Sequence, residues 1–368
     1  MKMALLVSCF NWYKARLEPV RDLLNSKGYE VTVLTSDFSH IKKKAIEERH
    51  SECTYIHVPP YKKNLSLDRI KSHLYFGKQV AKFIENEKPD LIYLLLPPNN
   101  TAKYCARYKR KNPETKLIID IIDLWPESMP LGALKRTPLA WIWKKWRDDA
   151  IKVADHVFTE CDLYQDKLAG ALNLSKTSTL HLFKEQTEEE KQLVQDIINR
   201  KEQDDTVRFA YLGSMNSIID IDGICKVIKE FISLGKKCKL HAIGDGESKE
   251  RFEKAVREIG CETHFYGKIF DEIEKIKILS PCDYAFNMMK GNISVGLTIK
   301  SIDYLAYGLP LINNIKGDTW KLVDEKKVGL NVAEEKVVFG SVDHGMVKRV
   351  FDDMFTKEMF VNSVRAVL

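Results

Sequence analysis

Short apolar segments alternate with amphipathic segments along the first half of the chain. Continuous apolar runs predict buried strands at 4–8, 31–35, 91–96, 116–122 and 156–159, and 3.6-residue periodicity predicts helices at 17–26 and 73–87. Strands that are apolar on both faces are typical of parallel sheets. The alternation of strands and helices therefore predicts an α/β fold built on a parallel sheet.

The same alternation restarts after a polar stretch, residues 184–205, which is rich in Glu, Gln, Lys and Asp. The later predicted strands are 207–212, 239–243, 263–266, 284–288 and 311–313, and the helices between them are 223–234, 248–259 and 271–279. We therefore expect two Rossmann-like, doubly wound domains facing a cleft, at 1–183 and 184–346. A C-terminal helix, 347–368, is expected near their junction. Alternatively, residues 184–205 are a surface excursion within one domain.

Composition narrows the class of protein. The chain has 368 residues, 44% hydrophobic and 30% charged, with a net charge of +6, which suits a soluble enzyme and does not indicate nucleic-acid binding. Its eight cysteines include no C-x-x-C pair, which disfavours a zinc site and fits a reducing cytoplasm. No apolar run approaches the ~18 residues of a membrane span.

Glycine turns follow the predicted strands of the second half. Gly213, Gly244 and Gly267 each stand directly after a strand, and Gly296 precedes a further short helix. Glycine lets a ligand approach the backbone, and a helix N-terminus attracts phosphate. Because these turns should share one edge of a parallel sheet, we expect a nucleoside diphosphate there. The sequence has no G-x-G-x-x-G or P-loop fingerprint.

Six segments of the second half occur in an order known from one family: 209–214, 240–247, 265–268, 280–285, 303–312 and 328–330. This half resembles the C-terminal domain of GT-B glycosyltransferases, particularly the retaining family 4. In the first half, residues 120–128 resemble a segment of transferases that build bacterial capsule and O-antigen sugars.

The resemblance implies a donor site in the second domain and an acceptor site in the first. The donor would be a nucleotide-diphosphate sugar, most plausibly a UDP-sugar, and the acceptor a saccharide or polyprenyl-linked saccharide, with no further cofactor. The expected donor-binding residues are Gly213, Ser214, Asn216, Gly244, Asp245, Gly267, Lys268, Ile269, Lys300, Ser301 and Asp303.

The sequence departs from the family pattern at several charged positions. The first glutamate of a common Glu-x7-Glu motif is Val295, the second is Asp303, a frequent arginine is Ser214, and the histidine of a common His-Asp pair is Ile122. Lys300 and Asp303 are three residues apart and so share a helix face. We expect Lys300 to replace the missing cations at the diphosphate, and Asp303 to bind ribose hydroxyls. The alternative is that Lys300 and Asp303 form an ordinary ion pair on the protein surface.

Two carboxylates after the strand at 116–122 are catalytic candidates. Asp123 would orient donor or acceptor hydroxyls, or only cap a turn, and Glu127 would act in acid–base chemistry or acceptor positioning. Together they leave a paired-carboxylate hydrolase open. The D-x-D pattern at Asp220 and Asp222 precedes a helix, so we expect a helix cap rather than a metal site.

Three tryptophans and three cations share residues 141–147. Such a mixture suits a membrane interface, and equally a helix with a buried face and a solvated face. Lysines at 42–44 and 62–63 would support peripheral membrane contact. We expect a cytoplasmic, metal-independent glycosyltransferase of bacterial surface polysaccharide synthesis. The alternatives are a GT-B-fold nucleotide-sugar epimerase and a non-catalytic sugar-nucleotide-binding partner; the oligomeric state is left open.

Overall fold

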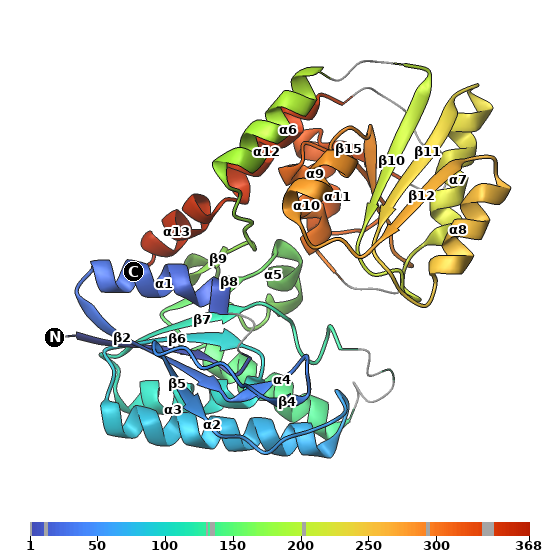
Figure 1. The fold of residues 1–368 in the computed structure, drawn as a ribbon. Coiled ribbons are helices and arrows are strands. Elements are labelled where there is room, and N and C mark those ends of the chain that lie inside the picture. The colour runs from blue at the N-terminus through green and yellow to red at the C-terminus, as the bar shows by residue number, and fades with distance from the viewer. Residues whose placement is uncertain are drawn as a thin grey trace. The chain divides into compact units, whose positions relative to one another are not determined.

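The computed structural model describes residues 2–10, 14–129, 132, 137–200, 204–291, 295–332 and 342–368. The chain forms two compact units, one of Met1–His181 with Phe360–Leu368 and the other of Leu182–Met359 (Figure 1). The predicted helix 347–368 is two helices, α12 (His344–Met354) and α13 (Lys357–Arg365). The last nine residues belong to the first unit, where the Lys116 ammonium donates to the Val367 carbonyl (2.5 Å).

The first unit is built on a seven-stranded parallel sheet of order β5-β2-β1-β6-β7-β8-β9. Its strands are β1 (Lys2–Ser8), β2 (Tyr29–Ser36), β5 (Cys53–Ile56), β6 (Leu91–Leu96), β7 (Lys116–Ile121), β8 (His156–Thr159) and β9 (Thr177–Thr179). Every residue of β6 is buried, as expected for a central strand covered on both faces. A separate antiparallel pair, β3 (Phe38–Ser39) and β4 (Lys44–Ala45), follows β2.

Helices cover both faces of this sheet, with α2 and α3 along one face and α1 on the other (Figure 1). The helices of this unit are α1 (Lys14–Ser26), α2 (Leu67–Glu87), α3 (Asn99–Lys111), α4 (Pro138–Ile151), α5 (Asp162–Leu168) and the 3₁₀ turn η3 (Leu174–Lys176). Ser66 caps α2 by accepting from the Arg69 N–H, so the local sequence fixes where this long helix begins.

The second unit is built on a six-stranded parallel sheet of order β12-β11-β10-β13-β14-β15. Its strands are β10 (Thr206–Leu212), β11 (Lys237–Ile243), β12 (Glu262–Gly267), β13 (Tyr284–Asn287), β14 (Leu311–Asn313) and β15 (Gly329–Asn331). Strand order reverses between β10 and β13, as in doubly wound folds, which bind ligands beyond the carboxyl ends of the strands at that point.

Alternate residues of β10 build two separate cores. Phe209 and Tyr211 face the core shared with α7 and α8, whereas Ala210 faces the core shared with α9, α10 and α12. The two sets of helices lie on opposite faces of the sheet (Figure 1). The remaining bounds are α6 (Glu188–Arg200), α7 (Ile221–Ser233), α8 (Lys249–Glu258), α9 (Glu272–Leu279), α10 (Ile299–Ala306) and α11 (Asp318–Lys326).

Candidate functional site

The loops after β10, β11 and β12 are hydrogen-bonded into one continuous edge. The Gly213 N–H donates to the Ile243 carbonyl (2.9 Å), and the Gly244 N–H donates to the Gly267 carbonyl (2.7 Å). Gly244 has φ +141°, and a Cβ there would lie 1.9 Å from the Gly213 carbonyl oxygen. Only glycine fits this approach. The structure therefore brings the three predicted glycine turns together at the carboxyl edge of the sheet.

The other predicted residues of this edge differ in what they offer a ligand. Ser214 is exposed. The Asn216 side chain accepts from the backbone N–H two residues later (3.1 Å). Asp245 and Lys268 form an exposed ion pair (3.6 Å), which is weak because water screens it. Ile269 packs against the core. Thus Ser214 and Lys268 can turn to a ligand at little cost, whereas Asn216 and Ile269 shape the loops.

Lys300 is a half-buried cation at the start of α10. Its ammonium lies 5.2 Å from the centre of the Tyr211 ring, and Tyr211 is next to the last residue of β10, one of the two strands at which the strand order reverses. Among the residues that the structure describes, no carboxylate forms an ion pair with it. Burial lowers the pKa of Lys300 to about 8. The ammonium is therefore still mostly protonated at pH 7 and lacks a counter-charge.

Asp303 does not pair with Lys300. Its Oδ1 accepts from the Lys184 ammonium (2.7 Å), which also contacts Glu272 and the Tyr307 hydroxyl. Burial would lower the pKa of Lys184, but the two carboxylates outweigh it and raise it. Burial would raise the pKa of Glu272, but hydrogen bonds from Lys184 and others bring it to about 2. Lys184, which the sequence did not single out, is thus the local partner of Asp303.

Ser301 is fully buried and serves the helix itself. Thr298 and Ser301 form a capping box at the N-terminus of α10, each side chain bonding the other's backbone. The Thr298 hydroxyl also donates to Asn287 Oδ1 (2.9 Å) at the end of β13. In the structure the Ser301 side chain serves this cap, which helps to fix the start of the helix that carries Lys300; its contact with a ligand stays a prediction.

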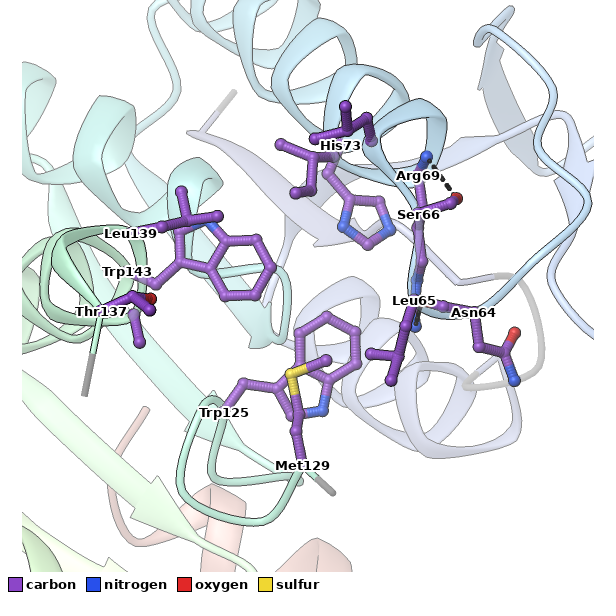
Figure 2. A pocket seen from close by; sticks show the side chains of 13 residues that line it. Asn64, Leu65, Ser66, Arg69, His73, Trp125, Met129, Thr137, Leu139 and Trp143 are labelled. Atoms are coloured by element: carbon purple, nitrogen blue, oxygen red, sulfur yellow. Dashed lines mark hydrogen bonds between the residues drawn. The ribbon is translucent and has the colours of Figure 1, made fainter. Parts of the chain in front are cut away.

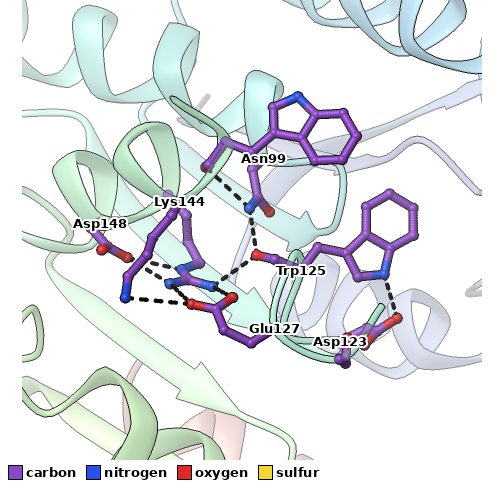
Figure 3. A network of polar contacts seen from close by, with 9 residues as sticks. Asn99, Asp123, Trp125, Glu127, Lys144 and Asp148 are labelled. Atoms are coloured by element: carbon purple, nitrogen blue, oxygen red, sulfur yellow. Dashed lines mark hydrogen bonds and ion pairs between the residues drawn. The ribbon is translucent and has the colours of Figure 1, made fainter. Parts of the chain in front are cut away.

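Asp123 follows β7 in the first unit, in a compact polar loop (Figure 3). Its carboxylate accepts from Trp125 Nε1 (2.6 Å) and from the Ser128 hydroxyl. Burial raises the pKa of Asp123, although these two hydrogen bonds oppose the change. A carboxylate with a raised pKa and fixed orientation is suited to accept a hydrogen bond or proton from a hydroxyl group.

Glu127 is instead held in a bidentate ion pair (Figure 3). Arg147 of α4 is fully buried and donates to both Glu127 oxygens (2.7 and 2.9 Å) and to the Trp125 carbonyl (2.8 Å). Burial would raise the pKa of Glu127, but the hydrogen bonds and charge of Arg147 outweigh it and lower it. Glu127 therefore stays ionised, and its contacts favour a positioning role for the loop that carries Asp123.

Asp220 caps α7, as predicted. Its Oδ1 accepts from the Gly223 N–H (3.0 Å), and its Oδ2 accepts from the Asn314 amide (2.9 Å). Asp222 pairs instead with Arg251 (3.1 Å). In the described part of the chain, no group of three or more His, Cys, Asp or Glu side chains is arranged to hold a metal ion.

The tryptophans of helix α4 differ in how far they are exposed. Trp141 is 63% exposed, but Trp143 packs against the core and Arg147 is fully buried. Only the first turn of the helix is thus both apolar and exposed. Over the described residues, no helix has the length and apolar character required to cross a bilayer.

The sequence did not point to a second group of polar residues, which lies in the first unit. Arg69 and His73 of α2 are buried polar side chains that line a cavity with Trp125 and Trp143 (Figure 2). The predicted helix began at His73, so neither residue stood out. The available signal was Ser66, a capping residue that starts α2 and places both side chains on its buried face.

Known proteins that resemble this chain have the same two-domain fold. Residues 206–338 match the family model described as glycosyl transferases group 1. Among solved structures, sucrose-phosphate synthase from Thermosynechococcus elongatus has a TM-score of 0.63 at 14% identity, covering 100% of this chain and 98% of that one. A lipopolysaccharide outer core galactosyltransferase, WaaB, has a TM-score of 0.61 at 14% identity, with 100% and 99% covered. Searches of curated proteins gave no match.

These similarities and the two parallel sheets identify the GT-B fold of two Rossmann-like domains. The match of residues 206–338, which include the glycine loops and Lys300, to this family model supports the identification of the protein as a glycosyltransferase.

Proposed function

We propose that this protein transfers a sugar from a nucleotide-diphosphate sugar to a saccharide or lipid-linked acceptor in bacterial surface polysaccharide synthesis. The donor binds at the carboxyl edge of the second sheet, and the acceptor hydroxyl binds at Asp123. The observation that carries the proposal is Lys300, a half-buried ammonium without a carboxylate ion pair among the described residues, which lies over Tyr211 near the end of β10, the strand that leads into the Gly213 loop.

In this proposal, Lys300 and the glycine loops stabilise the diphosphate as it leaves the sugar. Charge on the diphosphate grows as the glycosidic bond breaks, and a fixed ammonium in a partly dry site stabilises it without reorganising. Lys300 would supply this charge in place of a metal ion. The loops at Gly213 and Gly244 let the donor approach the backbone, and the exposed Ser214 adds a hydroxyl. Retention of anomeric configuration is proposed from the sequence resemblance.

In this proposal, Asp303 still binds the ribose of the donor. Lys184 binds its Oδ1, and its side chain is 22% exposed, which leaves Oδ2 for the hydroxyls of a ribose. Lys184 would then fix the orientation of the carboxylate. In the first unit, the raised pKa of Asp123 suits a carboxylate that orients an acceptor hydroxyl.

Isothermal titration calorimetry with UDP, GDP, ADP and dTDP tests the donor site. We expect one nucleotide to bind clearly, and Lys300→Met to weaken it about 10- to 100-fold, as for a charge-assisted hydrogen bond of ~1.5–3 kcal/mol. Lys254→Met is the matched control, since Lys254 is an exposed lysine of α8. Unchanged affinity in Lys300→Met would remove Lys300 from the site, and no binding of any nucleotide would refute the donor proposal.

A nucleotide-sugar epimerase is the second candidate. UDP-GlcNAc 2-epimerase from Methanocaldococcus jannaschii also matches this fold, with a TM-score of 0.51 at 11% identity over 100% of this chain and 99% of that one. An epimerase converts the nucleotide sugar without an acceptor, which proton NMR of the donor and enzyme alone would detect. A binding-only partner would bind the nucleotide and show neither epimerisation, hydrolysis nor transfer.

A further inference from the structure

The first unit contains an apolar cavity of about 290 Å³ between the starts of α2 and α4 (Figure 2). This volume lies near the lower end for small-molecule sites, ~300–1,000 Å³. Aliphatic and indole groups form most of its wall: Leu65, Leu67, Ile70, Trp125, Met129, Leu139, Ala140 and Trp143. The cavity adjoins Asp123, because Trp125 is both part of the wall and the donor to that carboxylate.

Arg69 places a buried cation in this apolar wall. It is 7% exposed, and its guanidinium lies 4.5 Å from the centre of the Trp125 ring. Its Nη1 donates to the Asn64 carbonyl (2.8 Å), but its Nε has no hydrogen-bond partner. No ion pair joins Arg69 to a carboxylate within the described ranges. Burial lowers the pKa of Arg69, and a hydrogen bond with Tyr61 and the charge of Asp123 offset this effect only in part. A buried charge without an ion pair is costly, so the arrangement points to an anion supplied from outside.

His73 adds a second unsatisfied polar group, one turn further along α2. It is 4% exposed, and its Nε2 has no hydrogen-bond partner. Burial lowers the pKa of His73 well below its usual range, with Arg69 adding to the effect, so the ring is neutral. A neutral imidazole can donate one hydrogen bond without adding charge. Figure 2 shows its ring directed toward the middle of the cavity.

The mouth of the cavity is apolar and exposed. Leu65 and Leu67 are 52% and 73% exposed, and across the opening Leu139 is 43% exposed. Trp141, on the same helix as Leu139, is 63% exposed. Exposed apolar side chains that gather around an opening mark a surface that another apolar phase covers. The rim therefore suits contact with the hydrocarbon of a lipid.

The distribution of polar atoms argues against a free saccharide in this cavity. A sugar ring carries hydroxyls around its whole edge and needs partners on every side. Here the two polar atoms without a hydrogen-bond partner, Arg69 Nε and His73 Nε2, lie together on α2. The wall has three further polar residues, Asn64, Ser66 and Thr137, and the Asn64 and Ser66 side chains already bond to Lys43 and Lys63. Most of the remaining wall is apolar. A ligand that fits has one anionic end and one apolar body.

We propose that this cavity binds the phosphorylated lipid part of the acceptor, with the phosphate at Arg69 and His73 and the first hydrocarbon units against Trp125, Trp143 and Leu139. The inference rests on the proposed transferase function, since it places the sugar-bearing end of the acceptor near Asp123. The small volume takes only the first part of the chain, and the exposed rim lets the remainder stay in the membrane.

Binding of three soluble probes tests the proposal: farnesyl phosphate, farnesol and inorganic phosphate, each followed by tryptophan fluorescence of the full chain. We expect farnesyl phosphate to bind at least 10-fold more tightly than farnesol, and inorganic phosphate not to bind measurably. Arg69→Gln should weaken farnesyl phosphate at least 10-fold. Arg107→Gln, at an exposed arginine of α3, should leave it unchanged. Leu139→Glu, at an exposed rim position that folding tolerates, should weaken it independently.

Equal binding of farnesol and farnesyl phosphate, binding of phosphate alone, or unchanged affinity in Arg69→Gln would overturn the proposal, as would no binding of farnesyl phosphate. Nucleotide titration on the same preparations separates this result from the donor proposal. Nucleotide binding without lipid phosphate binding refutes only the acceptor cavity, and the reverse refutes only the donor site. Near-ultraviolet circular dichroism confirms that each variant is folded.

Discussion

Replacement of Glu127 by glutamine tests whether this residue is catalytic or positions the Asp123 loop. The change removes the negative charge but keeps a side chain of the same shape. Arg147, which is fully buried, then loses its bidentate carboxylate partner, while its contacts with Asp148 (2.9 Å) and the Trp125 carbonyl (2.8 Å) remain. The guanidinium would remain charged in a dry environment with part of its compensation gone.

The magnitude follows from what remains around Arg147. Removal of one partner of a buried ion pair costs ~3–5 kcal/mol when the other charge is left uncompensated. Asp148 still neutralises part of the charge, and glutamine can accept one hydrogen bond. We therefore expect Glu127→Gln to lower the free energy of unfolding by about 2 kcal/mol. In Arg147→Met with Glu127→Gln, the losses should be non-additive by ~1 kcal/mol or more, since the pair is one unit.

Urea unfolding followed by tryptophan fluorescence measures this loss, because five of the six tryptophans lie in the first unit. Glu114→Gln, at an exposed glutamate of the same unit, is the control and should cost little. A loss below 0.5 kcal/mol in Glu127→Gln, together with strict additivity in the double variant, would refute the positioning role. A large fall in kcat at unchanged stability would instead favour acid–base chemistry.

Three further predictions concern the second unit. The affinity for a nucleoside diphosphate should be highest below pH 8 and fall as the pH rises through about 8. Burial lowers the pKa of Lys300 to about 8, and the neutral amine above that pH no longer attracts phosphate. Titration calorimetry from pH 6.5 to 9.5 measures the affinity, and a flat profile would contradict the prediction. Gly244→Ala should destabilise the second unit by more than ~1 kcal/mol in thermal unfolding, since its Cβ would meet a backbone oxygen at 1.9 Å. Gly170→Ala, a control in the first unit with open space around the Cβ, should be nearly neutral. Asp220→Ala should cost ~1 kcal/mol in urea unfolding as a lost helix cap, more than Asp222→Ala at an exposed side chain, and an equal cost of the two changes would contradict the capping role.

Local sequence was sufficient for most of the strands. The predicted strands 91–96, 156–159 and 311–313 coincide with β6, β8 and β14, because the interior residues of a strand covered on both faces are apolar. Helix α3 (Asn99–Lys111) was not predicted. It is rich in lysine and arginine, and its N-cap residue, Pro98, makes no side-chain hydrogen bond. A helix whose buried face includes polar residues such as Asn99, Asn100 and Thr101, and whose start is unmarked, carries little sequence signal.

Two kinds of site residue could be read from the chain alone. Gly213, Gly244 and Gly267 stand where parallel strands end, and their positive φ angles are a local property of the backbone. Asp220 caps a helix through a hydrogen bond to an N–H three residues away. Both predictions depend on atoms that are close in sequence, so residue type and spacing were enough.

Tertiary structure decided which charged side chains form ion pairs and which do not. Lys300 and Asp303 share a helix, yet Asp303 pairs with Lys184, 119 residues away, and Lys300 lies over Tyr211. Ser66 marks the start of α2, but the burial of Arg69 is visible only once α2 packs beside the loop of Trp125. The sequence by itself determined the parallel strands, the glycine turns and the helix cap, because these follow from backbone preferences and burial pattern. Which cations lack a partner, and hence where an anion can bind, depended on long-range packing, because both the desolvation of a charge and its neutralisation are set by neighbours distant along the chain.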